Sequence, residues 1–324
     1  MTQTNLSKRS HRGNNRKNKM KLLVNGTDIL DDVYLLECVY EDYATNKSSR
    51  LYLKFDDSDC LWQKWQMSKN DEIIIKDGQC DTGVMYAHRV QFSRGLCEIF
   101  AKSIPYYAPM KQQATFEDVK LSKFAQKAAA EMDFTIDMSN AADRLYKTVN
   151  LDNISFFQQF KQLCFLEGIG IIFYNKKIIL FNENTLENNA ASGDFEVEID
   201  EEFSISDNTD KIYGIGKLQN GYLEGKFTAN NGSTETLIYD GSTPATSVGE
   251  ANRFAKGILR NANKIALCGT VSTDLKTDYA AGSVLHLINA KAENYNGKIY
   301  VYKIRHDFVN DKSKLFFRYP IEDY

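Results

Sequence analysis

The residues that could carry chemistry are scattered along this chain, and none sits in a pattern that catalysis or metal binding requires. His88 and His306 each fall within a segment predicted to be a β-strand, where a single histidine is usually structural or directed into a pore. Cys164 lies on the apolar face of a predicted helix, and a thiol buried there is generally inert. The other cysteines form no C-x-x-C pair and have no histidine at metal-ligand spacing: Cys38, Cys60, Cys80, Cys97 and Cys268. In so long a chain this pattern is typical of reduced, mostly buried thiols in a cytosolic protein.

The acidic and glycine-rich patterns are equally weak. Glu167-Gly168 and the acids between residues 194 and 202 lack the paired spacing and the apolar pocket of an acid/base couple. Gly214-x-Gly216 is not followed by a phosphate-binding helix. A peptidoglycan hydrolase would need a zinc site or a Cys/His arrangement, and the sequence shows neither in a recognisable context. We therefore predict no catalytic residue, no cofactor-binding residue and no metal ligand, and we expect that the protein is not an enzyme.

Composition and charge exclude several further classes. The chain has 324 residues, 43% of them hydrophobic, which predicts two or three domains with cores of their own. Its net charge of −3 argues against nucleic-acid binding, because such domains usually carry a strongly basic face. No apolar run approaches the roughly 18 residues of a membrane span, and no signal peptide is visible. We expect a protein made in the bacterial cytoplasm, not inserted into a membrane, and exported only without a cleaved leader.

Charge is distributed unevenly. Residues 1–21 hold seven basic side chains and no acidic ones, which predicts a disordered basic arm or a segment ordered only against a partner. Residues 178–210 hold ten acidic side chains and no Lys or Arg. Two interpretations stay open for both runs: a solvated tail and a solvated linker, or segments that dock on neighbouring subunits.

Residues 22–107 form a β-rich region, the first part of the chain that must position the candidate residues named above. Its strand candidates are rich in β-branched and aromatic residues: residues 33–40, 49–55, and a hairpin over 71–93 that turns at Asp77-Gly78. Trp62 and Trp65 lie between strands and are predicted to be core or barrel-lid residues.

Residues 108–206 change to a helical apolar period. Thr115 and Asp118 resemble a capping box and predict a helix that carries Phe116 on its apolar face. A stronger helix has five apolar residues on one face, namely Phe156, Phe157, Phe160, Leu163 and Cys164. Gly168 is placed to end it, and a hairpin over 169–181 follows. Together with the acidic linker, these elements predict an α+β insert.

Residues 207–324 are again β-rich, with one helix. Ser247 and Glu250 form a capping box, followed by an apolar helical face. The strand candidates are residues 212–217, 235–239, 267–273, 284–288, 297–308 and 314–318. The predicted fold class is α+β and mainly β, with two β domains of similar size flanking the insert.

The order of these elements resembles the phage late control D family, the baseplate hub proteins of contractile phage tails, which also occur in contractile bacteriocins and extracellular injection systems. The segments that carry the resemblance are residues 71–93, 149–174, 279–284 and 295–306. In the last of these, Gly297, Tyr300, Ile304 and His306 look like the G-x-Y-x-V-x-x-V-x-H type of ending common in this family. The resemblance implies two tube-like β-barrel domains and a hub-type architecture.

The resemblance also implies a function, a structural baseplate hub of a contractile tail or injection machine. Three copies of a chain with two barrels make a pseudo-hexameric ring, which can adapt a sixfold inner tube to a threefold spike. The implied partners are two further copies of the chain, a separate trimeric spike protein, an inner tube or tube-initiator protein and other baseplate proteins, with a tape-measure protein as a further candidate. The implied location is the assembled phage tail or injection particle.

Two alternatives of other classes stay open. A cell-wall or glycan-binding tail protein would fit the tyrosine and phenylalanine content, and a lytic tail protein stays open because tail hubs of other phages carry lytic domains. An effector-translocation adaptor would fit the basic arm. The sequence does not distinguish a phage from a bacteriocin or another injection system.

Overall fold

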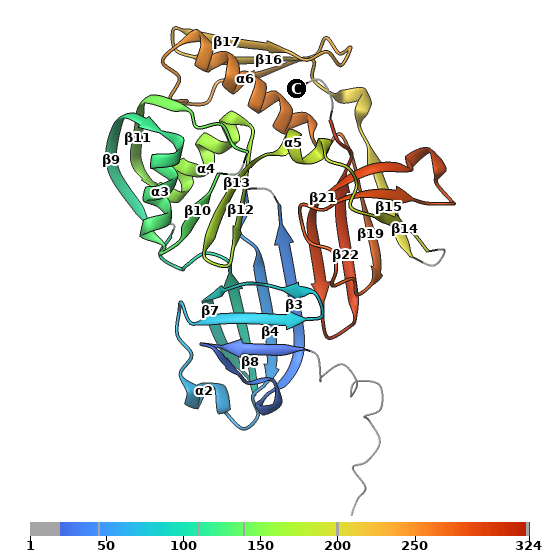
Figure 1. Ribbon diagram of the computed structural model, residues 1–324. Coiled ribbons are helices and arrows are strands. Elements are labelled where there is room, and N and C mark those ends of the chain that lie inside the picture. Colours follow the sequence, from blue (N-terminus) through green and yellow to red (C-terminus); the bar gives the residue numbers. More distant parts are fainter. Residues whose placement is uncertain (1–19, 45, 109, 139, 199–200, 322–323) are drawn as a thin grey trace, which may run out of the picture.

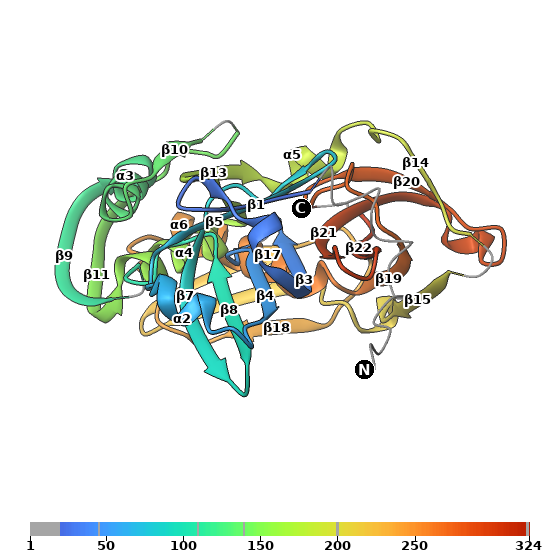
Figure 2. The same ribbon diagram turned by 90° about the horizontal axis from the view of Figure 1, so that it is seen from below.

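The computed structural model describes residues 20–44, 46–108, 110–138, 140–198, 201–321 and 324. Within these ranges, fourteen strands form one curled sheet that runs from the lower blue strands to the red strands in Figure 1. Seen from below in Figure 2, the blue strands curve around one side and the red strands around the other. The sheet therefore has the form of an open half-barrel.

The N-terminal half of the sheet is built by eight strands: β1 (Lys21–Val24), β2 (Thr27–Asp28), β3 (Tyr34–Tyr43), β4 (Arg50–Asp56), β5 (Glu72–Asp77), β6 (Cys80–Asp81), β7 (Met85–Ser93) and β8 (Leu96–Lys102). A short helix, α2 (Leu61–Trp65), and a single turn at Leu30–Asp32 cover its end. Strand β4 shows why these segments form a sheet, because Leu51, Leu53 and Phe55 are buried while the residues between them are not. The predicted core position of Trp62 is confirmed, whereas Trp65 is 43% exposed.

The C-terminal half of the sheet is built by β14 (Asp194–Glu196), β15 (Glu202–Asp207), β19 (Leu267–Asp274), β20 (Val284–Ile288), β21 (Gly297–Asp307) and β22 (Lys312–Arg318). The two halves join where β21 pairs antiparallel with β3, from Lys303 opposite Tyr43 to Asp307 opposite Val39. This long-range pairing turns the two predicted β regions into one continuous sheet.

The described insert contains three helices and two small sheets: β9 (Lys111–Lys120), α3 (Leu121–Glu131), β10 (Thr135–Asp137), β11 (Leu145–Ser155), α4 (Phe156–Glu167), β12 (Ile169–Tyr174), β13 (Lys177–Asn182) and α5 (Glu183–Asn188). The stronger predicted helix is confirmed. The Ser155 side chain accepts from the backbone N–H of Gln158 in a capping box, and Gly168 ends the helix with a φ of 67°.

The predicted capping box at Thr115 and Asp118 is wrong. Both residues belong to β9, which pairs along its length with β11, and the helix begins only at Leu121. Phe116 nevertheless packs against the ring of Phe124, with centroids 5.5 Å apart. Strand pairing with β11 therefore decides the conformation here, over a helical pattern that the apolar residues also satisfy.

The apolar residues of segment 215–263 share one core with the insert. Strands β16 (Ile215–Asn220), β17 (Leu223–Thr228) and β18 (Thr236–Tyr239) form a small sheet, which α6 (Val248–Asn263) covers on the insert side (Figure 1). The predicted serine cap of α6 is confirmed, because the Ser247 side chain accepts from the N–H of Glu250. The reciprocal bond of a capping box is not made, since the Glu250 side chain accepts from the backbone N–H of Thr246. Helix α6 approaches α4 closely at Gly257, where an added Cβ would lie 2.1 Å from the carbonyl oxygen of Leu166.

The predicted fold class, mainly β with an α+β insert, is confirmed. The domain boundaries at residues 21, 107 and 206 stay a prediction. No helix in the described ranges is long and apolar enough to span a membrane.

Candidate functional site

His88, His306 and Cys164, the side chains considered in the sequence analysis for catalysis, lie on different elements and have different neighbours. His88 lies in β7, where its Nε2 is 2.8 Å from the carbonyl oxygen of Ile104 and burial lowers its pKa. His306 is buried in β21, and burial lowers its pKa to about 4. Cys164 is fully buried on α4, and burial raises the pKa of its thiol well above the usual value. Each group is therefore held neutral at physiological pH.

The histidine–hydroxyl pair of His306 and Ser313 is structural. Nδ1 of His306 lies 2.9 Å from Oγ of Ser313, but both residues are only 1% exposed. Ser313 also accepts from the backbone N–H of Lys276. A substrate cannot reach the hydroxyl, so the pair joins β21, β22 and a neighbouring loop.

The glycine pair and the acidic residues considered in the sequence analysis also belong to strands. Gly216 lies in β16 under α6, where a Cβ would meet the carbonyl oxygen of Ala255 at 2.7 Å. Asp194 and Glu196 lie in β14 and Glu202 begins β15, so their backbone belongs to the large sheet while their side chains are exposed. Most of the basic arm, residues 1–19, lies outside the described residues, as do residues 199–200 of the acidic run.

Two acids of the run 178–210 are neither solvated nor available to a neighbour. Glu183 and Glu187 on α5 are buried, and each accepts from Arg260 on α6, at 2.8 and 2.6 Å. Arg318 on β22 also pairs with both carboxylates. Lys264 Nζ lies 3.3 Å from Glu183. This ionic cluster ties the insert, α6 and the large sheet together at one point.

Burial and the neighbouring charges act in opposite directions on the pKa values within the ionic cluster. Burial alone would raise the pKa of Glu183, but Lys264, Arg318 and Arg260 outweigh burial and hold that pKa below its usual value. Burial lowers the pKa of Lys264, and Glu183 opposes that shift only in part. Burial also works against the charge of Arg318, yet its bond to Glu187 raises its pKa. Glu183 and Arg318 thus remain charged because each faces groups of opposite charge.

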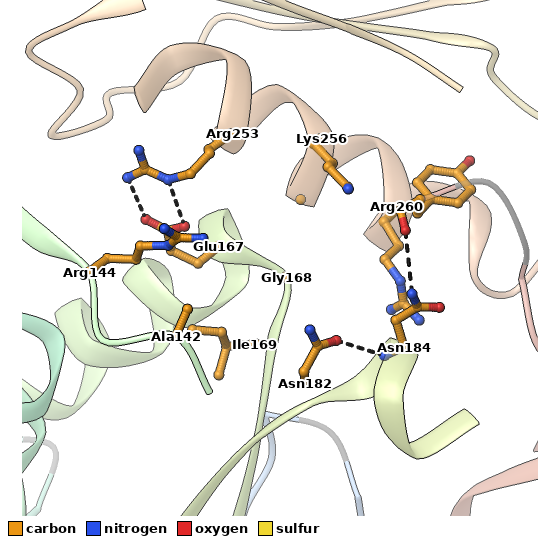
Figure 3. A pocket seen from close by; sticks show the side chains of 12 residues that line it. Ala142, Arg144, Glu167, Gly168, Ile169, Asn182, Asn184, Arg253, Lys256 and Arg260 are labelled. Carbon is orange, nitrogen blue, oxygen red and sulfur yellow. Dashed lines mark hydrogen bonds and ion pairs between the residues drawn. The ribbon is translucent and has the colours of Figure 1, made fainter. Parts of the chain in front are cut away.

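A cationic pocket of about 240 Å³ opens beside this cluster, between the end of α4, α6 and the start of α5 (Figure 3). Its basic side chains are Arg144, Arg253, Lys256 and Arg260, and Glu167 is the one acid lining it in the described chain. Glu167 is already held by Arg253 through two hydrogen bonds of 3.2 and 3.0 Å. Arg144 and Lys256 point towards the same space in Figure 3.

The cationic pocket can hold an anionic group such as a carboxylate. Arg253 is paired with Glu167 and Arg260 with Glu183 and Glu187, which leaves Arg144 and Lys256 to face such a group. Sequence reasoning missed it. Arg253, Lys256 and Arg260 recur at i, i+3 and i+7 on α6 and so share a face, a signal that the sequence contains. Their counterpart Arg144 comes from a distant loop, which no local pattern indicates.

No group of three or more His, Cys, Asp or Glu residues in the described part of the chain is arranged to hold a metal ion.

No protein-family model matches the chain, and a search among curated proteins finds no match. Solved structures do match. A 43 kDa tail protein of prophage MuSo2 from Shewanella oneidensis has a TM-score of 0.69 and 8% identity, covering 93% of this chain and 98% of that one.

Two matches come from secretion machinery. The E. coli c3393 protein, described as a component of the type VI secretion system with structural similarity to T4 tail proteins gp27 and gp5, has a TM-score of 0.58 and 10% identity, covering 94% of this chain and 78% of that one. A chain of the Francisella PdpA–VgrG complex has a TM-score of 0.54 and 8% identity, covering 93% of this chain and 57% of that one. At these identities the similarity is one of fold, and this chain has the fold of these tail and secretion-system proteins.

Proposed function

We propose that this protein is a structural baseplate hub of a contractile tail or injection machine. The observation that carries the proposal is the extent of the shared fold: the similarity to the prophage tail protein covers 93% of this chain and 98% of that one. A match over both halves and the insert supports a common architectural role more strongly than a match of one domain would.

The edges of the large sheet support assembly into a ring. In the described chain, β15 pairs only with β19. Strand β7 pairs with β8 along its length, but its pairing with β5 ends at Tyr86. Open edges at two separate places are a liability in a monomer, and pairing with other chains removes it. In a ring, strands of the adjacent copies can pair with these open edges and so close the half-barrel.

We infer a homotrimer from symmetry. Two β regions per chain match a sixfold tube only when three copies associate, and the contacts are then heterologous, with residues 22–107 of one copy against residues 207–324 of the next. The inferred partners are a separately encoded trimeric spike, an inner tube or tube-initiator protein, and other baseplate proteins. The protein acts in this view without catalysis, in the assembled particle.

Native mass spectrometry of the protein with its separately encoded spike tests the proposal. The spike is included because a partner that binds the assembled state stabilises it by mass action. The expected species is a complex with three copies of this chain, with cross-links between residues 22–107 and 207–324 of different copies. A stable monomer or dimer in the presence of the spike, without such cross-links, would refute the hub proposal.

A further inference from the structure

A groove of about 460 Å³ at the α2 end of the large sheet is lined by one sign of charge. Two segments form it, the turn at Leu30–Asp32 and the loop that leads from β4 into α2. Five aspartates and no basic residue line this acidic groove: Asp31, Asp32, Asp56, Asp57 and Asp59. The whole chain has a net charge of only −3, so the acidic groove is a strong local concentration of negative charge.

The acidic groove contains buried polar atoms without partners. Asp57 is 3% exposed, and its Oδ1 accepts from the backbone N–H of Trp62 at 2.9 Å. Its Oδ2 has no hydrogen-bond partner among the described residues, and neither has Nε1 of Trp62, which is 1% exposed. A buried polar atom left unpaired costs about 1–3 kcal/mol. One acceptor and one donor left unpaired suit a peptide ligand, which offers basic side chains as donors and carbonyl oxygens as acceptors.

The groove also carries apolar surface suited to long basic side chains. Tyr34 is 64% exposed and Leu61 is 37% exposed, and both line it. Lysine and arginine pack their methylene stems on such surface while the charged head group meets a carboxylate. A free metal ion would use the aspartates but not Tyr34, Leu61 or Trp62.

The N-terminal segment of the chain has the complementary charge. Residues 1–19 contain six basic side chains and no acidic one: Lys8, Arg9, Arg12, Arg16, Lys17 and Lys19. The described chain begins beside the groove, because the carbonyl oxygen of Leu22 accepts from the N–H of Ile29, immediately before the turn at Leu30–Asp32. Ten extended residues span roughly 33 Å, so the basic residues can reach the aspartates of their own chain.

We propose that the acidic groove binds the basic N-terminal arm, residues 1–19, of the same chain. Tethering makes the contact intramolecular, and the short connection gives the arm a high effective concentration at the groove. Because most of the groove aspartates are exposed, the contact weakens as ionic strength rises. The inference concerns one face of the monomer and does not depend on the hub proposal.

Zero-length carboxyl–amine cross-linking of the full-length protein tests this. An equal mixture of ¹⁴N- and ¹⁵N-labelled protein separates links within a chain from links between chains. We expect links from Lys8, Lys17 and Lys19 to Asp31, Asp32 and Asp59, predominantly within one chain and reduced at high salt. A second readout is trypsin cleavage within the arm, which binding should slow.

Matched variants decide the outcome. The triple variant Asp31→Asn, Asp32→Asn, Asp59→Asn removes the carboxyl groups that would be linked, so cleavage is its readout, and the arm should be cleaved about tenfold faster than in the wild type. The control variant makes the same charge change at exposed sites elsewhere: Asp152→Asn, Asp210→Asn, Asp240→Asn. In the control variant, the arm should be linked and cleaved as in the wild type. The melting temperature measured by circular dichroism should be unchanged in both the groove variant and the control variant. The single variant Asp32→Asn, expected to have a partial effect, replaces the triple variant if that one unfolds.

Three results would overturn the proposal. The first is cleavage of the arm at the same rate in the wild type and the groove variant. The second is arm links scattered over acids outside the groove. The third is mixed-label links that make up about half of all arm links, the share that random pairing of chains gives. The last would assign the groove to the arm of a second copy.

Discussion

Substituting Glu187 by glutamine should destabilise the protein more than substituting its partner Arg260 by methionine. Glu187 is fully buried and accepts from Arg260 and Arg318. The ionic cluster holds three cations, Arg260, Arg318 and Lys264, and two carboxylates, which gives a net charge of +1. Glu187→Gln raises that charge to +2, whereas Arg260→Met lowers it to zero. Because charge in a buried site is costly, the direction of the change decides which variant suffers more.

The magnitude follows from the cost of breaking a buried pair, about 3–5 kcal/mol when one partner is removed. Glu187→Gln should cost about 4 kcal/mol, since two guanidiniums and an ammonium are left facing Glu183 alone. Arg260→Met should cost about 2 kcal/mol, since both carboxylates keep Arg318 and the methionine retains part of the apolar stem.

Urea denaturation followed by circular dichroism measures these differences. Glu202→Gln is the matched control, because its side chain is 77% exposed and lies 4.0 Å from Lys314. A surface change of this kind should stay within about 0.5 kcal/mol of wild type. The charge argument fails if Arg260→Met costs more than Glu187→Gln, or if Glu187→Gln costs less than about 1 kcal/mol.

Three further predictions concern other parts of the molecule. The pKa of His306 is about 4 in the folded protein against 6.5 ordinarily, so the unfolded chain binds the proton first as the pH falls. Stability should therefore be lost between pH 6.5 and about 4, by up to about 3 kcal/mol, and a His306→Gln variant should show a flatter dependence in urea titrations at each pH. Phe160→Ala should cost about 3–5 kcal/mol because its ring is fully buried on α4, while Phe92→Ala, at a 41% exposed site, should cost under about 1 kcal/mol in the same assay. Phe92→Asp at the end of β7 should prevent the trimer from forming without lowering the melting temperature, as measured by native mass spectrometry. The control is Tyr222→Asp, at a fully exposed turn, and loss of the trimer in that variant too would contradict the prediction.

The sequence was sufficient where local chemistry determines structure. Helix α4 has a serine cap, a continuous apolar face and Gly168, and each of these acts within a few residues of its position. The hairpin of β12 and β13 turns at Asn175 and Lys176, both with positive φ, as a two-residue hairpin connection requires. Helix α6 was found by its serine cap for the same reason.

The sequence was insufficient where the partner lies far along the chain. Phe116 fits a helical apolar face, but pairing with β11, about thirty residues later, makes its segment a strand. The cationic pocket was missed because Arg144 and α6 meet only in three dimensions. The acidic run 178–210 was interpreted as solvated or docked on a neighbour, although Glu183 and Glu187 bind Arg260 and Arg318, more than seventy residues away.

These distant pairings also determine how the parts of the molecule are held together. The insert with α6 has one apolar core, and the two halves of the large sheet have others. Polar groups contribute to the joints between them, the ionic cluster at β22 and the pair of Lys303 with Glu41 at 2.6 Å where β21 meets β3. Hydrophobic burial is non-directional, whereas paired charges are satisfied in one geometry and costly in others. Loss of a joint should therefore change the relative placement of the parts before it unfolds any of them, and assembly should report that loss more sensitively than melting.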